Sequence, residues 1–107
     1  MLDKSESLYM EVPPRHIEVR AQIPPKGATL EIVQFAGCAA YTGQTTVKLI
    51  WDHGGESEEI LAAAHGDATF AMVRQLTGDG QKKLALVLEN RTDTACLLGG
   101  RYEAREL

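Results

Sequence analysis

Turn-forming residues recur about every ten residues from Ile17 to the end of the chain, and this spacing constrains the fold more than any other feature of the sequence. Proline cannot donate to a strand ladder, and glycine, asparagine and aspartate tolerate the backbone angles of turns. The segments between these signals are too short for most stable helices. The main turn signals are Pro24-Pro25-Lys26-Gly27, Thr42-Gly43-Gln44, Asp52-His53-Gly54-Gly55, His65-Gly66-Asp67, Thr77-Gly78-Asp79-Gly80 and Asn90-Arg91-Thr92-Asp93.

Strands are therefore predicted between these turns. Ile17, Val19 and Ala21 alternate with polar residues, which is typical of a half-buried strand with one wet face. Residues 59–64 would also suit two helical turns, but glycines on both sides leave too little length, so a strand is favoured. Asp79-Gly80 is the strongest hairpin signal. The predicted strands cover residues 17–23, 29–40, 45–51, 59–64, 69–76, 83–90 and 95–106, the last as one strand or as two separated at Gly99-Gly100.

This pattern predicts an all-β protein, an antiparallel β-sandwich of seven to eight strands, with a jelly roll as one arrangement that would satisfy it. Residues 1–16 lack periodicity and end in Pro13-Pro14, so they are predicted to form an extended N-terminal arm in front of a sandwich domain at residues 17–107. The arm is partly apolar, and its predicted oligomer or assembly contacts are Leu8, Tyr9, Met10 and Val12.

Several of the predicted strands are apolar on both faces, as in Leu30–Phe35, Ile60–Ala63 and Leu84–Leu88. A sandwich standing alone buries one face of each sheet and wets the other. Two explanations are open: small residues or the arm cover the outer face, or that face is a subunit interface. The residues predicted for the core are Val47, Leu49, Trp51, Phe70, Met72, Leu84, Leu86 and Leu88.

Size and charge narrow the function classes. The chain has 107 residues, 11 basic and 15 acidic, with a net charge of -4, which fits one domain and disfavours nucleic acid as a partner. No apolar run reaches the roughly 18 residues of a membrane span, and no signal peptide is recognisable, so cytoplasmic folding is expected, with a virion as another final location. Cys38 and Cys96 are interpreted as reduced core residues, with a disulfide as the second reading.

No catalytic constellation is found. Asp52-His53 and His65-Gly66-Asp67 pair histidine with carboxylate, but these loops flank one strand and would lie ~20 Å apart. Both cysteines lack a neighbouring base, and no phosphate-binding or nucleophile motif occurs. We therefore expect no enzyme, no metal and no cofactor. If Asp52, His53, Glu56 and Asp79 gather at one end of the sheet, they could bind a cation, and a metal-dependent enzyme using His53 and Asp79 is the third hypothesis.

A resemblance adds a more concrete expectation. The stretch Val47–Gly55, followed by Gly78–Leu86, is similar to small β-sandwich accessory proteins of phage particles, such as head-decoration proteins. That resemblance implies a short arm, a compact β domain, association into oligomers and attachment to a capsid.

The sequence thus predicts a non-catalytic structural or interaction protein, most concretely a homo-oligomeric virion decoration or accessory component, whose partners are itself and a larger assembly. The alternative is a small carbohydrate- or ligand-binding module. In that alternative the ring of Trp51, Tyr41 or Tyr102 stacks on the ligand and the loops carrying Asp52, His53 and Asp79 supply hydrogen bonds.

Overall fold

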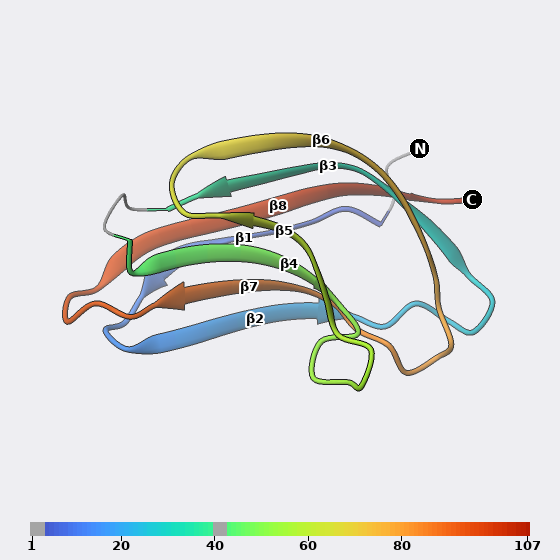
Figure 1. The fold of residues 1–107 in the computed structure, drawn as a ribbon, viewed down its shortest axis with the longest axis horizontal. Helices are drawn as coiled ribbons and strands as arrows, with labels where there is room; N and C mark the ends of the chain where they lie inside the picture. The colour runs from blue at the N-terminus through green and yellow to red at the C-terminus, as the bar shows by residue number, and fades with distance from the viewer. Residues whose placement is uncertain (1–3, 40–42) are drawn as a thin grey trace.

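The computed structural model describes residues 4–39 and 43–107, which form two four-stranded antiparallel sheets and no helix (Figure 1). An all-β antiparallel sandwich with eight strands is therefore confirmed. The strands are β1 (Glu6–Val12), β2 (His16–Gln22), β3 (Thr29–Cys38), β4 (Thr45–Trp51), β5 (Glu59–Ala64), β6 (Ala68–Thr77), β7 (Leu84–Asn90) and β8 (Cys96–Glu106).

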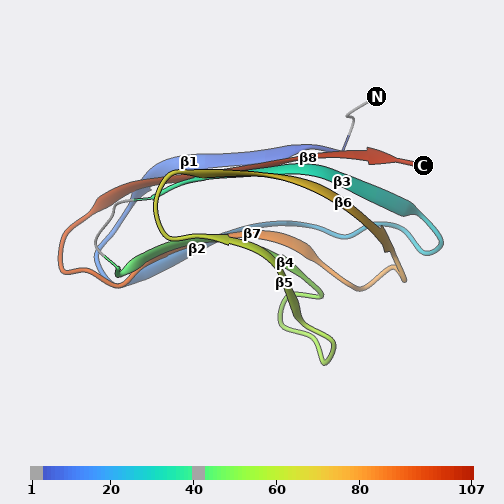
Figure 2. The ribbon, with the colours of Figure 1, turned by 45° about the horizontal axis from the view of Figure 1, so that its top comes forward.

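The strand order is that of a jelly roll. One sheet, the β1 sheet, runs β1-β8-β3-β6, and the other, the β2 sheet, runs β2-β7-β4-β5. The hydrogen-bonded pairs are nested around the β4–β5 hairpin: β3 pairs with β6, β2 with β7 and β1 with β8. A long hairpin rolled over two layers gives this nesting. Figure 2 shows the two layers stacked, with the β4–β5 loop projecting away from the β1 sheet.

The core lies between the sheets and follows strand alternation. On β4, Val47, Leu49 and Trp51 point inward, whereas Lys48 points outward, as the sequence predicted. Phe70 is an error of the prediction, because its ring stacks on Phe35 at the open edge beside β5 and stays 42% exposed. Met72 is partly buried against the core. The largest fully buried side chains include Leu30, Ile32, Phe35, Leu49, Leu84, Leu86, Leu88, Leu98 and Tyr102.

The predicted arm is wrong for residues 6–12, which form the edge strand β1. Leu8, Met10 and Val12 alternate inward and pack on the core, while β1 is hydrogen-bonded along β8, with Glu6 opposite Tyr102. Tyr9 obscured this period of two in the sequence because it adds an apolar residue on the outward side. The N-terminal segment therefore belongs to the sandwich.

The predicted hairpin at Asp79-Gly80 is also wrong, since β6 and β7 lie in different sheets. A tight hairpin turn of this type needs positive φ at both central residues. Gly80 has a φ of 85°, but Asp79 does not have a positive φ. Among the described residues other than glycine, only Arg15 and Asp52 do. The Asp79 carboxylate instead accepts hydrogen bonds from the backbone N–H groups of Gln81 and Lys82, both at 2.8 Å.

The last strand passes through Gly99-Gly100 without a break. At Gly100 the sheets approach so closely that a Cβ would lie 2.6 Å from Cγ1 of Val47. At Gly99, on the opposite side of β8, the Tyr9 ring takes the space, 2.3 Å from where a Cβ would be. The two glycines are therefore close-packing positions of one strand.

Candidate interaction surface

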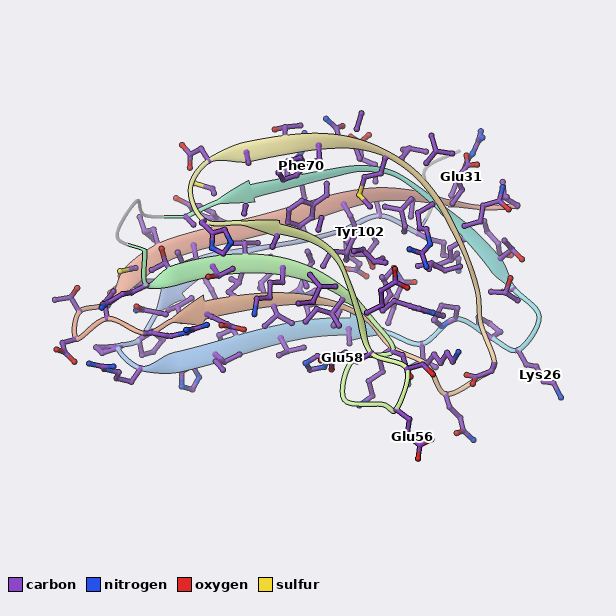
Figure 3. The ribbon with its side chains drawn as sticks, in the orientation of Figure 1. Lys26, Glu31, Glu56, Glu58, Phe70 and Tyr102 are labelled. Carbon is purple, nitrogen blue, oxygen red and sulfur yellow. The ribbon has the colours of Figure 1, made fainter. Side chains whose placement is uncertain are left out.

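The loop residues predicted to bind a ligand or cation do meet at one end of the sandwich. The backbone N–H of Gly27 donates to the carbonyl of Gly78 at 2.9 Å, and that of His53 donates to the carbonyl of Lys83 at 3.3 Å. Figure 3 shows Lys26 and Glu56 extending outward at this end. The three loops are thus neighbours in space.

Their carboxylates, however, stabilise turns. Asp52 accepts a hydrogen bond from the backbone N–H of Ser57 at 2.9 Å, and Glu58 accepts one from Gly54 at 2.6 Å. Hydrogen bonds from Lys82 and Gln81 hold the pKa of Asp79 below its ordinary value. Across the described residues, no three His, Cys, Asp or Glu side chains are grouped so that they could hold a metal ion.

Two of the three rings proposed to stack on a ligand, those of Trp51 and Tyr102, are not accessible. Trp51 is 7% exposed and Tyr102 is 1% exposed, both in the core. The Tyr102 hydroxyl accepts a hydrogen bond from Nε2 of Gln22, and burial raises the pKa of Tyr102 to about 12. Tyr41 lies outside the described residues.

Cys38 does not fit the predicted role of a buried core residue, and Cys96 fits it in part, because it packs against the core while half-buried. Cys38 is exposed at the end of β3, Cys96 is half-buried, and both are free thiols, so the disulfide reading is wrong too. The pKa of Cys38 is raised most by a hydrogen bond with Asp67 and, to a smaller extent, by the partial loss of water around the thiol. Its thiol therefore stays protonated at neutral pH and is a poor nucleophile.

Strand β2 is turned the opposite way from what its alternation suggests. Arg20 lies opposite Leu86 of the core side of β7, whereas Ile17 and Val19 face outward and are 57% and 42% exposed. The polar side chains on the other side of β2 reach the N-terminal backbone: Nη1 of Arg20 donates to the carbonyl of Ser7 in β1, and Nε2 of Gln22 donates to the carbonyl of Lys4 just before β1, both at 2.9 Å. These hydrogen bonds connect the edge strand β2 to the edge strand β1 of the other sheet. The apolar side of β2 therefore faces solvent.

These outward residues continue across the β2 sheet. In one row Ala21, Ala85, Ile50 and Ile60 lie side by side on β2, β7, β4 and β5, and in the next row Val19, Val87, Lys48 and Ala63 do so. Ile50, Ala85 and Val87 form a buried cluster separate from the core. We refer to the following set as the apolar face: Ile17, Val19, Ala21, Ile50, Ile60, Ala63, Ala85 and Val87.

One ion pair is embedded in the apolar face. Nζ of Lys48 lies 2.9 Å from Oε1 of Glu89, and their side chains are only 20% and 13% exposed. Arg91, on the rim, lies 3.1 Å from the other carboxylate oxygen. Burial pushes the pKa of Glu89 upward, but the hydrogen bonds from Lys48 and Arg91 outweigh burial and leave that pKa below its ordinary value.

The apolar surface extends around the β5 edge. Ala63 also lines a groove of about 410 Å³ between β5 and β6, together with Leu61, Ala62, Phe70, Ala71 and Met72. A bidentate salt bridge joins Arg74 of β6 to Glu59 of β5, with N–O distances of 2.5 and 2.7 Å. The groove and the apolar face together present apolar side chains from β2 to β6.

The outer face of the β1 sheet is different. Arg105 pairs with Glu31 at 2.6 Å, and Arg101 pairs with Glu103 at 3.4 Å. We call these four residues the charged face. A shallow groove of about 230 Å³ lies beside Arg101, between Tyr9 and Cys38.

Fold and surface together define a jelly-roll domain whose β2 sheet has an apolar outer face. The sequence matches no family model and no curated protein sequence. Among solved structures, the chain is similar to the mitogen of Yersinia pseudotuberculosis, with 9% sequence identity, a TM-score of 0.62, and coverage of 94% of this chain and 85% of that one. It also aligns with PirA at 16% identity, a TM-score of 0.41 and coverage of 96% and 94%.

The likeness to the mitogen shows a shared fold, because an identity this low does not carry activity from one protein to another. The described part of the chain offers no helix with the length and apolar character that a membrane crossing requires.

Proposed function

We propose that this protein is a non-catalytic structural protein that self-associates through its apolar face and joins a larger assembly. The observation that carries the proposal is the orientation of β2, which places Ile17 and Val19 on the outer side of the sheet and Arg20, itself exposed, on the side that faces β1. Exposed Ile60 lies on the other edge of the same face. An antiparallel sheet normally wets its outer face with polar residues, so a face of this kind is typical of a buried contact.

Strand β1 does not cover this face, because it lies in the other sheet. A second copy would bury Ile17, Val19 and Ile60 of both subunits, and removing an aliphatic side chain from water contributes about 1.5–3 kcal/mol when burial is complete. The four strands of this sheet lie about 4.8 Å apart and rise ~3.3 Å per residue. The face they form is therefore small compared with the interfaces of permanent dimers. We expect reversible self-association with a dissociation constant in the micromolar range. Binding should be tighter in a larger assembly, where each copy makes several contacts at once.

The test is the mass in solution across a concentration series, by sedimentation velocity or light scattering. Val19→Lys, on edge strand β2, should shift the protein to monomer, because it places a charge inside the contact. Val73→Lys is the matched control: it is the same substitution on edge strand β6, at a position that is 88% exposed outside the apolar face. A monomeric wild type at every concentration, or equal loss in both variants, would contradict the proposal.

Attachment to a larger assembly, a capsid in the case of head-decoration proteins, is the second part of the proposal. Of the four residues expected to make this contact, Leu8, Met10 and Val12 point into the core, and only Tyr9, 65% exposed, faces outward. Tyr9→Ser should weaken co-sedimentation with particles from cells that produce the protein. Undiminished co-sedimentation would exclude β1 from the attachment site.

A further inference from the structure

The inference here rests on the proposed self-association and specifies its geometry. We infer that Lys48 and Glu89 make the apolar face selective for a second copy of this chain, with Lys48 of one copy meeting Glu89 of the partner subunit across a two-fold axis. The pair thereby fixes the orientation of the two copies.

The position of the pair supports this role. Lys48 on β4 lies opposite Val87 and Ala63, and Glu89 on the adjacent β7 lies opposite Ile17. Both belong to central strands of the β2 sheet, within the face and away from its edges. Neighbouring apolar side chains already remove most of the water around them, as the 20% and 13% exposures show.

Covering the face removes the remaining water, and this determines which partner fits. A purely apolar partner would remove the remaining water from both charges without supplying an opposite charge or a hydrogen bond in its place. A compensating partner must present a cation and an anion with the same separation and opposite direction. A second copy does so when a two-fold axis in the plane of the contact runs at right angles to the line from Lys48 to Glu89 and passes through its midpoint.

Charge balance favours the same occupant. The whole chain carries a net charge of -4, so two copies repel each other over most relative orientations. The apolar face holds one cation and one anion, with Arg91 at its rim. Contact through this face therefore adds no excess of negative charge to the repulsion between two acidic molecules, and the alternating signs disfavour other registers.

Charge reversal tests the inference. Lys48→Glu gives a face with two anions, and Glu89→Lys gives a face with two cations. At a concentration where the wild type is dimeric, each variant alone should be monomeric, with self-association weakened at least ~10-fold. An equimolar mixture of the two, with one variant uniformly labelled with ¹⁵N so that the masses differ, should form a heterodimer that native mass spectrometry distinguishes from either homodimer.

The double variant Lys48→Glu/Glu89→Lys is the folding control, since it keeps the ion pair within each chain and should restore the homodimer. Circular dichroism of each single variant checks that the sheets are intact. A dimeric wild type whose single variants dimerise equally well, or whose mixture gains nothing, would overturn this inference alone. A wild type that stays monomeric would overturn the proposed function, and this inference with it.

Discussion

The outer face of the β1 sheet carries ion pairs, whereas the outer face of the β2 sheet carries the apolar face. On the first, Glu31 and Arg105 pair across neighbouring strands, as charged residues do when a sheet faces water. On the second, Ile50, Ala85 and Val87 form their own cluster, and a single ion pair lies among aliphatic side chains. The central strands of both sheets turn apolar residues toward the core, so the outer faces show the clearest difference between the sheets.

This difference shows that a contact surface is better recognised by comparing faces than by composition. Overall hydrophobicity of 44% is ordinary for a globular chain. The asymmetry becomes visible only after β2 is placed with Arg20 inward and Val19 outward.

Leu86→Ala should lower the free energy of unfolding by about 2–5 kcal/mol, because Leu86 is fully buried between the sheets and its loss leaves a cavity. Leu97→Ala, at a 57% exposed position on the outer side of the β1 sheet, should change it by less than about 0.5 kcal/mol. Urea denaturation measures both. Similar losses would mean that the outer side of the β1 sheet is as buried as the core.

Asn90→Ala should cost about 1–3 kcal/mol, since it leaves buried backbone carbonyls without donors. Nδ2 of Asn90 donates to the carbonyls of Val12, Pro13 and Thr94 at 3.0, 3.1 and 2.9 Å, joining the ends of both sheets. Asn90→Asp, of equal size but without these donors, should be at least as unstable in thermal melts. Full stability of the Asp variant would show that packing, and not hydrogen bonding, is what matters at this position.

Tyr9→Ser should cost only about 0.2–1 kcal/mol, the range of a cross-strand contact on an exposed face. The Tyr9 ring lies opposite Gly99 and covers its backbone. Chemical denaturation at neutral pH measures the loss. A much larger loss would place Tyr9 in the folding core and would prevent its use in the attachment test.

Glu31→Gln should have the smallest effect, visible only through pH. Hydrogen bonds from Arg105 and Gln75 lower the pKa of Glu31 from its ordinary 4.5. The folded carboxylate therefore contributes stability above the unfolded pKa, and this contribution is lost as pH falls through the lower folded pKa. Between neutral pH and about pH 3, the urea midpoint of the wild type should fall more than that of the variant. Parallel pH profiles would remove Glu31 from the acid response.

Local alternation and turn chemistry were enough to predict seven of the strands. Strand β7 is an example, because Leu84, Leu86 and Leu88 indicate both its period of two and its buried side. Sequence could not predict which side of β2 faces inward, since that depends on where the polar Arg20 and Gln22 find partners on β1. Nor could it show that Asp79-Gly80 crosses between sheets, because turn residues are used alike in hairpins and crossovers.

For the surface, the sequence offered a usable signal in strands that are apolar on both sides. Ala85 and Val87 carried that signal, and both lie in the apolar face. The loop residues were misleading: the loops that carry Asp52 and Asp79 are neighbours, yet each carboxylate accepts hydrogen bonds from the backbone of its own turn. Trp51 stood out as the chain's one tryptophan, but its ring fills the core.

The pairing of the first strand with the last has a consequence for how the molecule is made. Ser5 and Ala104, which share hydrogen bonds beside β1, are 99 positions apart. A ribosome adds about 5–20 residues per second, so β1 waits several seconds for β8. During synthesis Leu8 and Met10 have no core to enter, and the sandwich closes only once its final strand has left the ribosome.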